Sequence, residues 1–129
     1  FLNGEDLVIN GDGKHSRDFT FIENVVQANI KSALTDNKDA VNEVYNVAFG
    51  ENTSLLQLVD AIKQGLVALG RPTNSKVIYG PVRSGDVKHS LANISKAKDF
   101  VGYCPEFSFS RGIEFTLDWY LKKADFFYK

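Results

Sequence analysis

The segment from residue 54 to residue 72 constrains the fold of this 129-residue chain more than any other. Ser54 and Gln57 have the spacing of a capping box, in which two side chains satisfy backbone N–H groups at the start of a helix. Gly70 and Pro72 are typical of a helix end. Between these signals the apolar residues recur at helical spacing, at Leu55, Leu58, Val59, Ile62, Leu66 and Leu69. We therefore predict an amphipathic helix that ends at Gly70.

Short apolar runs bounded by turn residues indicate buried strands elsewhere in the chain. Three such runs lie at 6–11, 44–49 and 76–82, and residues 17–22 are expected to be extended. Helical spacing marks two more segments, 22–34 and 108–124, and Asn93 is expected to cap a short helix that runs through Phe100 and is ended by Gly102. The sequence therefore predicts an α/β fold: one small mixed α/β domain over residues 1–129, with about three short strands and four helices.

Composition excludes several classes of partner. The formal net charge is −1, so no overall field attracts nucleic acid or an anionic membrane. No apolar run approaches the roughly 20 residues of a membrane span. The single cysteine, Cys104, excludes an internal disulfide and fits a reducing compartment. We expect a cytoplasmic protein that binds neither nucleic acid nor a membrane.

The first of two arginines of interest follows a glycine-rich polar loop. This loop covers residues 11–16, and Arg17 comes directly after it. A guanidinium presents a planar fork of donors that matches phosphate oxygens. The alternative is a surface arginine paired with Asp18 or Glu23, and the segment alone does not decide between the two.

The second arginine follows the strand predicted at 76–82. Arg83 and Asp86 flank a Ser-Gly turn. Arg83 could hold a second phosphate oxygen, and Asp86, which only accepts hydrogen bonds when ionised, could take both hydroxyls of a ribose. The alternative is a local Arg83–Asp86 ion pair that stabilises the turn. The small polar Ser90 is either a pocket wall or the start of the next turn.

The histidines and the cysteine do not indicate a metal site or a thiol nucleophile. His15 and His89 lie far apart in the sequence, and neither has a second ligand at the spacing typical of a metal site. Cys104 precedes Pro105 in a predicted loop without a neighbouring base. We predict no metal ligand and no catalytic residue in this chain.

Three segments together resemble a known family. They read INGDGKHSRDFTFIENVVQANI (9–30), YNVAFGENTSLLQLVDAI (45–62) and RSGDVKHSLANISKAKDFVGYCPEFSFSRGIEFTLDWY (83–120). They resemble the C-terminal part of extended short-chain dehydrogenase/reductases. More narrowly, they are similar to UDP-N-acetylglucosamine 4-epimerases, which interconvert UDP-GlcNAc and UDP-GalNAc. The resemblance covers nearly the whole chain, with the motifs in the family's order and at its spacing.

The resemblance implies roles for the charged residues. Arg17 and Arg83 match the two arginines that bind the diphosphate of a UDP-sugar. Asp86 matches the acid that takes the hydroxyls of the uridine ribose. On this basis the anion held between the two arginines is the pyrophosphate of a UDP-sugar.

The resemblance also implies the outline of a pocket. Val8 and Asn10 match the strand that borders uracil and ribose. Ser90 matches the position that bounds the sugar pocket, where a small residue leaves room for an N-acetyl group. His89 stands beside it and is expected to help shape that wall.

The family's cofactor and catalytic motifs do not occur in this sequence. The family binds NAD through a GxxGxxG turn, whereas here the close glycine pair Gly11–Gly13 is followed at position 16 by serine. The family's catalytic pair is YxxxK, but no tyrosine here has lysine four positions later. We expect residues 1–129 to be a C-terminal nucleotide-sugar-binding domain of a longer enzyme, with the Rossmann domain absent.

The resemblance therefore predicts the UDP-sugar-binding part of a UDP-N-acetylglucosamine/UDP-glucose 4-epimerase. It implies that NAD, bound by the parent enzyme, oxidises C4 of the sugar, and that the 4-keto sugar is then reduced from the other face. It also implies a homodimeric parent that associates through its other domain. The alternatives are a dehydratase or decarboxylase of the same superfamily, or a non-catalytic module that binds nucleotide sugars.

Overall fold

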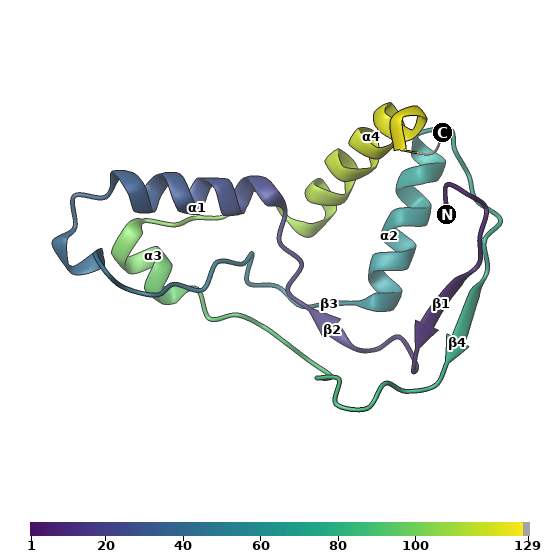
Figure 1. The fold of residues 1–129 in the computed structure, drawn as a ribbon, viewed down its shortest axis with the longest axis horizontal. Coiled ribbons are helices and arrows are strands. Elements are labelled where there is room, and N and C mark those ends of the chain that lie inside the picture. The colour runs from purple at the N-terminus through teal and green to yellow at the C-terminus, as the bar shows by residue number, and fades with distance from the viewer. Residues whose placement is uncertain (128–129) are drawn as a thin grey trace.

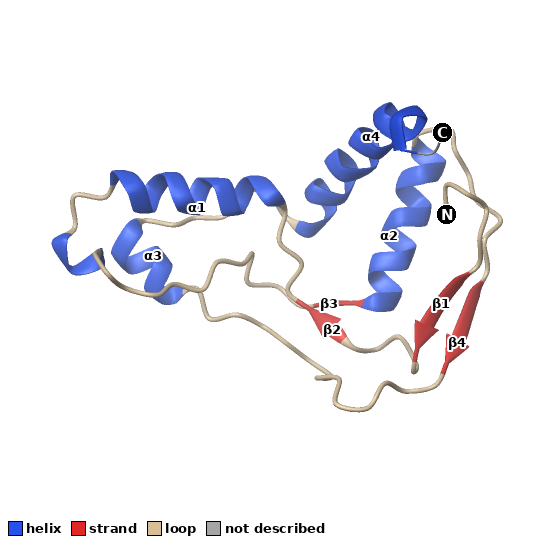
Figure 2. Cartoon of the chain, viewed as in Figure 1, coloured by secondary structure: helices blue, strands red, loops and turns tan. Residues whose placement is uncertain are grey.

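The computed structural model describes residues 1–127, which contain four α-helices, one 3₁₀ helix and four short strands (Figures 1 and 2). In chain order these elements are β1 (Leu7–Asn10), β2 (Ser16–Arg17), α1 (Ile22–Leu34), η1 (Lys38–Ala40), β3 (Thr53–Ser54), α2 (Leu55–Ala68), β4 (Val77–Gly80), α3 (Ser95–Val101) and α4 (Phe109–Phe127). The predicted small mixed α/β fold is confirmed.

The molecule has two ends joined by a narrow middle (Figure 1). Helices α1 and α3 pack together at one end, and α2 and α4 pack together at the other, near the β1–β4 pair. Strands β2 and β3 lie between the two ends, and a long loop runs from β4 past β2 to α3. No helix among the described residues has both the length and the apolar character needed to cross a membrane.

The strands form two separate pairs. Strands β1 and β4 are parallel, in register from Leu7 opposite Val77 to Asn10 opposite Gly80. Strands β2 and β3 are antiparallel, and a single parallel bridge joins Ser16 to His89 on the other side of β2. The short strand β2 therefore lies between two segments that are distant from it in sequence.

Helix α2 begins as the sequence predicts. The side chain of Ser54 accepts a hydrogen bond from the backbone N–H of Gln57 at 3.2 Å, and the Gln57 side chain accepts one from the N–H of Ser54 at 2.8 Å. Gly65 lies where α2 meets α4. A Cβ atom at this position would come within 2.4 Å of Leu117 Cδ1, so a larger residue there would force the Leu117 side chain to move.

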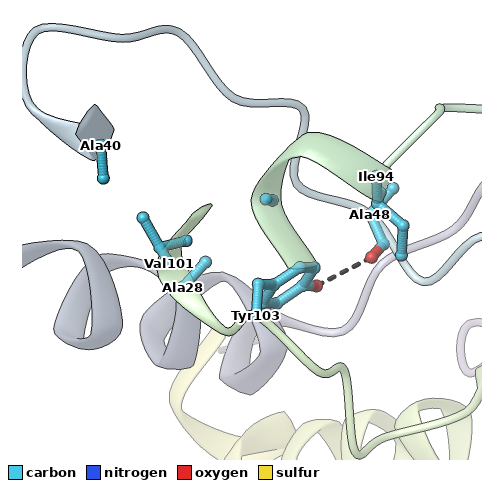
Figure 3. Close-up of a cluster of buried hydrophobic side chains, with 7 residues drawn as sticks. Ala28, Ala40, Ala48, Ile94, Val101 and Tyr103 are labelled. Carbon is cyan, nitrogen blue, oxygen red and sulfur yellow. Dashed lines mark hydrogen bonds between the residues drawn. The ribbon is translucent and has the colours of Figure 1, made fainter. Parts of the chain in front are cut away.

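A cluster of buried hydrophobic residues joins α1, η1 and α3 (Figure 3). Its members are Ala28, Ala40, Ala48, Ile94, Ala97, Val101 and Tyr103. The alanines allow the backbones to approach closely. The hydroxyl of Tyr103 donates to the carbonyl of Ala48 at 2.8 Å, so this buried polar group is satisfied.

The strand predicted at 44–49 is not formed within the described residues, and this prediction is wrong. The segment is held by side chains instead of by a neighbouring strand. The carboxylate of Asp18 accepts from the backbone N–H groups of Phe49 at 3.2 Å and Gly50 at 3.1 Å. It also accepts from the N–H of Ala92 at 3.4 Å. Asp18 therefore binds backbone groups and is not the partner of Arg17.

Asn24 fixes α1 against the segment that leads into α4. It is completely buried, and its Oδ1 accepts from the N–H groups of Glu106 and Phe107, each at 3.0 Å. Its Nδ2 donates to the carbonyl of Phe107 at 2.7 Å. An asparagine in the first turn of a helix gives no sequence signal for this role, because such residues are usually exposed.

The last two helices agree with the prediction within a few residues. Helix α3 begins at Ser95, whose N–H donates to Oδ1 of Asn93 at 3.0 Å, and it ends at Gly102 in the left-handed conformation. Helix α4 begins at Phe109, one residue later than expected.

Candidate functional site

The backbone of β2 places the segments 15–17 and 88–90 against each other. The N–H of Ser16 donates to the carbonyl of Lys88 at 2.8 Å, and the N–H of Ser90 donates to the carbonyl of Ser16 at 3.2 Å. Both of the predicted arginine-bearing segments thus meet at this strand.

Arg17 and Asp86 form an ion pair across this junction. Nη2 of Arg17 lies 2.5 Å from Oδ1 of Asp86, and Nη1 donates to the carbonyl of Ser16 at 2.8 Å. Both side chains are about one-third exposed. The alternative pairing of Arg17 with Asp18 or Glu23 is wrong, because the guanidinium contacts Asp86 instead.

His15 binds the other oxygen of the same carboxylate. Its Nδ1 lies 3.2 Å from Oδ2 of Asp86, where a protonated Nδ1 donates to the carboxylate. The His15 side chain is only 12% exposed. The sequence analysis missed this contact. One feature of the sequence could have indicated it. Alternate residues of an extended segment point to the same face, and His15 and Arg17 are two positions apart.

These contacts hold Asp86 in its ionised form. The hydrogen bond from His15 lowers the pKa of the Asp86 carboxyl, and the charges of Arg17, His15 and Arg83 lower it further, against the opposing effect of burial. Asp86 is therefore an acceptor-only group at neutral pH.

Arg83 lies in an exposed turn on the Asp86 loop. The N–H of Asp86 donates to the carbonyl of Arg83 at 3.4 Å, whereas the Asp86 carboxylate contacts Arg17 and His15. The proposed local Arg83–Asp86 ion pair is therefore wrong. The charge of Arg83 still acts on Asp86, so the two arginines lie within electrostatic reach of one carboxylate.

His89 and Ser90 also contact β2. Nδ1 of His89 and the hydroxyl of Ser16 share a hydrogen bond of 2.9 Å. Ser16 is buried, whereas His89 and Ser90 are exposed. Of these three residues, only His89 and Ser90 can form part of a pocket wall that faces solvent.

Val8 and Asn10 lie on one face of the β1–β4 pair. Both are exposed, and a Cβ atom on Gly80 would lie 3.3 Å from a side-chain atom of each. A hollow of about 570 Å³ continues from the end of these strands. Its lining residues are Gly11, Asp12, Tyr79, Gly80, Pro81 and Val82.

A separate apolar cavity of about 620 Å³ lies between α1 and α4. Phe21, Phe107, Phe115 and Trp119 line it, and it shares no lining residue with the charged group around Asp86. The charged group offers guanidinium donors for an anion beside carboxylate acceptors for hydroxyls. The aromatic cavity also has carboxylates and one lysine ammonium group in its lining, but no guanidinium.

Comparisons with known proteins place the chain in a family. The family model described as GDP-mannose 4,6 dehydratase matches residues 2–116. The dTDP-glucose 4,6-dehydratase of Xanthomonas campestris pv. campestris (strain B100) is 35% identical over 125 residues, which covers 93% of this chain and 35% of that protein.

Solved structures also match over nearly the whole chain. The UDP-N-acetylglucosamine 4-epimerase of Methanobrevibacter ruminantium M1, in complex with UDP-N-acetylmuramic acid, superposes with a TM-score of 0.80 at 36% identity, over 95% of this chain and 36% of that one. The UDP-glucuronic acid 4-epimerase of Bacillus cereus, in complex with UDP-glucuronic acid and NAD, superposes with a TM-score of 0.82 at 28% identity. The match covers 95% of this chain and 37% of that one.

The chain thus spans a little over one-third of the length of these relatives. The epimerases among them bind UDP-sugars, and the Bacillus cereus enzyme binds NAD as well. The resemblance to the C-terminal part of extended short-chain dehydrogenase/reductases is confirmed. The chain belongs to the GDP-mannose 4,6 dehydratase family of NAD-dependent nucleotide-sugar epimerases and dehydratases.

Proposed function

We propose that this chain is the nucleotide-sugar-binding part of a UDP-sugar 4-epimerase that acts on UDP-N-acetylglucosamine and UDP-glucose. The observation that carries the proposal is the meeting of Arg17 with Asp86, which lie 69 residues apart in the sequence. A cation and a hydroxyl acceptor side by side suit a diphosphate attached to a ribose.

In this proposal the two arginines bind the pyrophosphate. The guanidinium of Arg17 has five N–H donors, of which the contacts to Asp86 and the Ser16 carbonyl use two. The remaining donors can bind phosphate oxygens while the ion pair is kept. Arg83, exposed on the facing turn, supplies the second guanidinium.

Asp86 takes the ribose hydroxyls, and the remaining residues border the base and the sugar. Val8 and Asn10 share the exposed face of β1, which suits them to uracil and ribose. Ser90 and His89 form the wall beside the sugar. The small side chain of Ser90 leaves room for an N-acetyl group.

The reaction itself requires groups that residues 1–127 do not offer. Gly11 and Gly13 lie in a loop that leads into β2, whereas a dinucleotide turn leads into a helix. The Gly11–Gly13 loop therefore does not fit the turn that binds NAD. We assign the cofactor and the acid–base pair to a larger enzyme of the length seen in the relatives, in which NAD would remove and return hydride at C4.

An exposed apolar row on α1 supports this assignment. Ile22, Val26, Ile30 and Leu34 recur at intervals of four residues and all are exposed, whereas Ala28 on the opposite face is buried. Apolar patches of this extent on a surface usually mark an interface. The dinucleotide-binding part of the proposed enzyme would cover this row.

The test is an assay of the 129-residue chain and of the longest natural polypeptide that contains it. Each is given NAD⁺ and UDP-GlcNAc, UDP-glucose or dTDP-glucose. We expect turnover only with the longer polypeptide, with UDP-GalNAc and UDP-galactose as products. A 4-keto-6-deoxy product from dTDP-glucose would identify a dehydratase instead. Binding without turnover in either polypeptide would identify a non-catalytic module.

A further inference from the structure

His15 is held rigidly beneath Asp86. Its carbonyl accepts from the N–H of Leu55 at 3.0 Å, and the carbonyl of Gly13 accepts from the N–H of Leu56 at 3.1 Å. Both bonds tie the loop before β2 to the first turn of α2. The His15 side chain is also largely buried, so its ring has little freedom to move.

Asp86, in contrast, lies on a loop whose residues 81–90 are all exposed. Its carboxylate is shared between two partners, with Oδ1 toward Arg17 and Oδ2 toward His15. In the proposed function Arg17 keeps its ion pair with Oδ1 and also binds the pyrophosphate with its remaining donors. His15 is the partner whose side-chain contact is made to the carboxylate, at Oδ2.

A carboxylate that is already held in the right orientation recognises a vicinal diol better than a mobile carboxylate does. Each carboxylate oxygen has lone pairs beyond the one used by His15 or Arg17, and these can accept two hydroxyl hydrogens from one ribose. Without His15 the Asp86 side chain would have to be ordered during binding, which costs conformational entropy.

We propose that His15 is a positioning residue that orients Asp86 toward the 2′,3′-diol of the nucleotide, so that the site selects ribonucleotides over 2′-deoxyribonucleotides. This inference rests on the proposed function, which assigns the ribose to Asp86. It adds His15 to the site and excludes dTDP-sugars from the preferred substrates.

The test is calorimetric titration of the folded 129-residue chain with uridine diphosphate and with 2′-deoxyuridine diphosphate. The wild-type chain should bind the ribonucleotide about tenfold more tightly, the effect of one hydrogen bond to a charged group. His15→Phe and His15→Leu should lose most of this ratio. His15→Asn, whose amide nitrogen can replace Nδ1 as the donor, should restore it.

Arg71→Ala is the control, because Arg71 is exposed in the segment after α2 and has no part in the proposed site. It should keep the wild-type ratio. Thermal melts verify that each variant is folded. Should His15→Leu fail to fold, His15→Phe and the wild-type ratio still decide the question.

Three outcomes overturn the inference, and they differ in what else they affect. An unchanged ratio in His15→Phe overturns the role of His15 alone. Equal affinity of the wild-type chain for both nucleotides overturns the role of His15 and the assignment of the 2′-hydroxyl to Asp86, and leaves the pyrophosphate site of the proposed function standing. Failure of the folded wild-type chain to bind uridine diphosphate overturns both the inference and the proposed function.

Discussion

Nη2 of Arg17 and Oδ1 of Asp86 lie 2.5 Å apart, although 69 residues separate them in the sequence. The pair joins the glycine-rich loop before β2 to the loop that follows β4, through the backbone bonds that β2 makes with the segment 88–90. This junction brings two glycine-containing polar segments together at the proposed anion site.

Removal of either arginine should weaken nucleotide binding. We expect Arg17→Ala and Arg83→Ala each to reduce the affinity for UDP by about 1.5–3 kcal/mol, the range for hydrogen bonds to charged groups. Arg17→Ala should have the larger effect, because it also releases Asp86. The affinities for UDP and for UDP-GlcNAc should fall by similar amounts, since both ligands contain the diphosphate.

Calorimetry with Arg71→Ala as the control tests this expectation. Arg71 is an exposed arginine that follows the last turn of α2, whereas β3, the partner of β2, directly precedes the first turn. If both site variants bind UDP as the wild type does, the pyrophosphate assignment is wrong.

Ser90→Tyr should separate N-acetylated sugars from plain hexoses. A tyrosine ring would occupy the volume that we assign to the N-acetyl group, and overfilling a packed site costs about 1–3 kcal/mol. We expect at least about a tenfold loss of kcat/KM for UDP-GlcNAc in the longer natural enzyme, with little change for UDP-glucose. Equal losses for both sugars, together with a lower Tm, would indicate a role for Ser90 in folding alone.

The pKa of Asp86 reports directly on the hydrogen bond from His15. Because the folded-state pKa is lowered below 3.8, Asp86 contributes to stability above its unfolded pKa, and the contribution is lost as the pH falls through the folded value. His15→Phe should raise this pKa more than Arg83→Ala does. Carboxyl ¹³C NMR titration measures both changes. An Asp86 that titrates at 3.8 in the wild-type chain would contradict the geometry.

Asn24→Ala should destabilise the fold without altering nucleotide recognition. It removes the partners of three hydrogen bonds at a fully buried position, so we expect a loss of about 2–4 kcal/mol in the free energy of unfolding. Asn29→Ala is the control, because Asn29 is exposed on the same helix and bonds only the carbonyl of Val25. Denaturant titration should show a change below about 0.5 kcal/mol for it. Similar losses in the two variants would contradict the assigned role of Asn24.

Local signals made most of the fold predictable. The capping box and the stop residues of α2, and the apolar spacing of α1 and α4, depend on neighbours within a few positions. The segment 44–49 was not predictable in the same way. Its residues favour a strand, but a strand also needs a partner, and Asp18 and Tyr103 bind its backbone instead.

The residues of the candidate site were predictable, but their contacts were not. Arg17, Arg83 and Asp86 stood out as charges in glycine-containing loops. Their pairing depended on which distant segment lies beside β2, and no local pattern encodes that. His15 was overlooked because histidine at that position was weighed only as a metal ligand.

The central claim is that the nucleotide binds at the junction of β2 with the Asp86 loop. Two-dimensional ¹H–¹⁵N NMR of the 129-residue chain during titration with UDP tests it most directly. We predict the largest amide shifts at Arg17, Asp86 and Ser90, with little change at Phe115 and Trp119 in the apolar cavity. Shifts confined to the apolar cavity, or no shifts at millimolar UDP, would contradict the account.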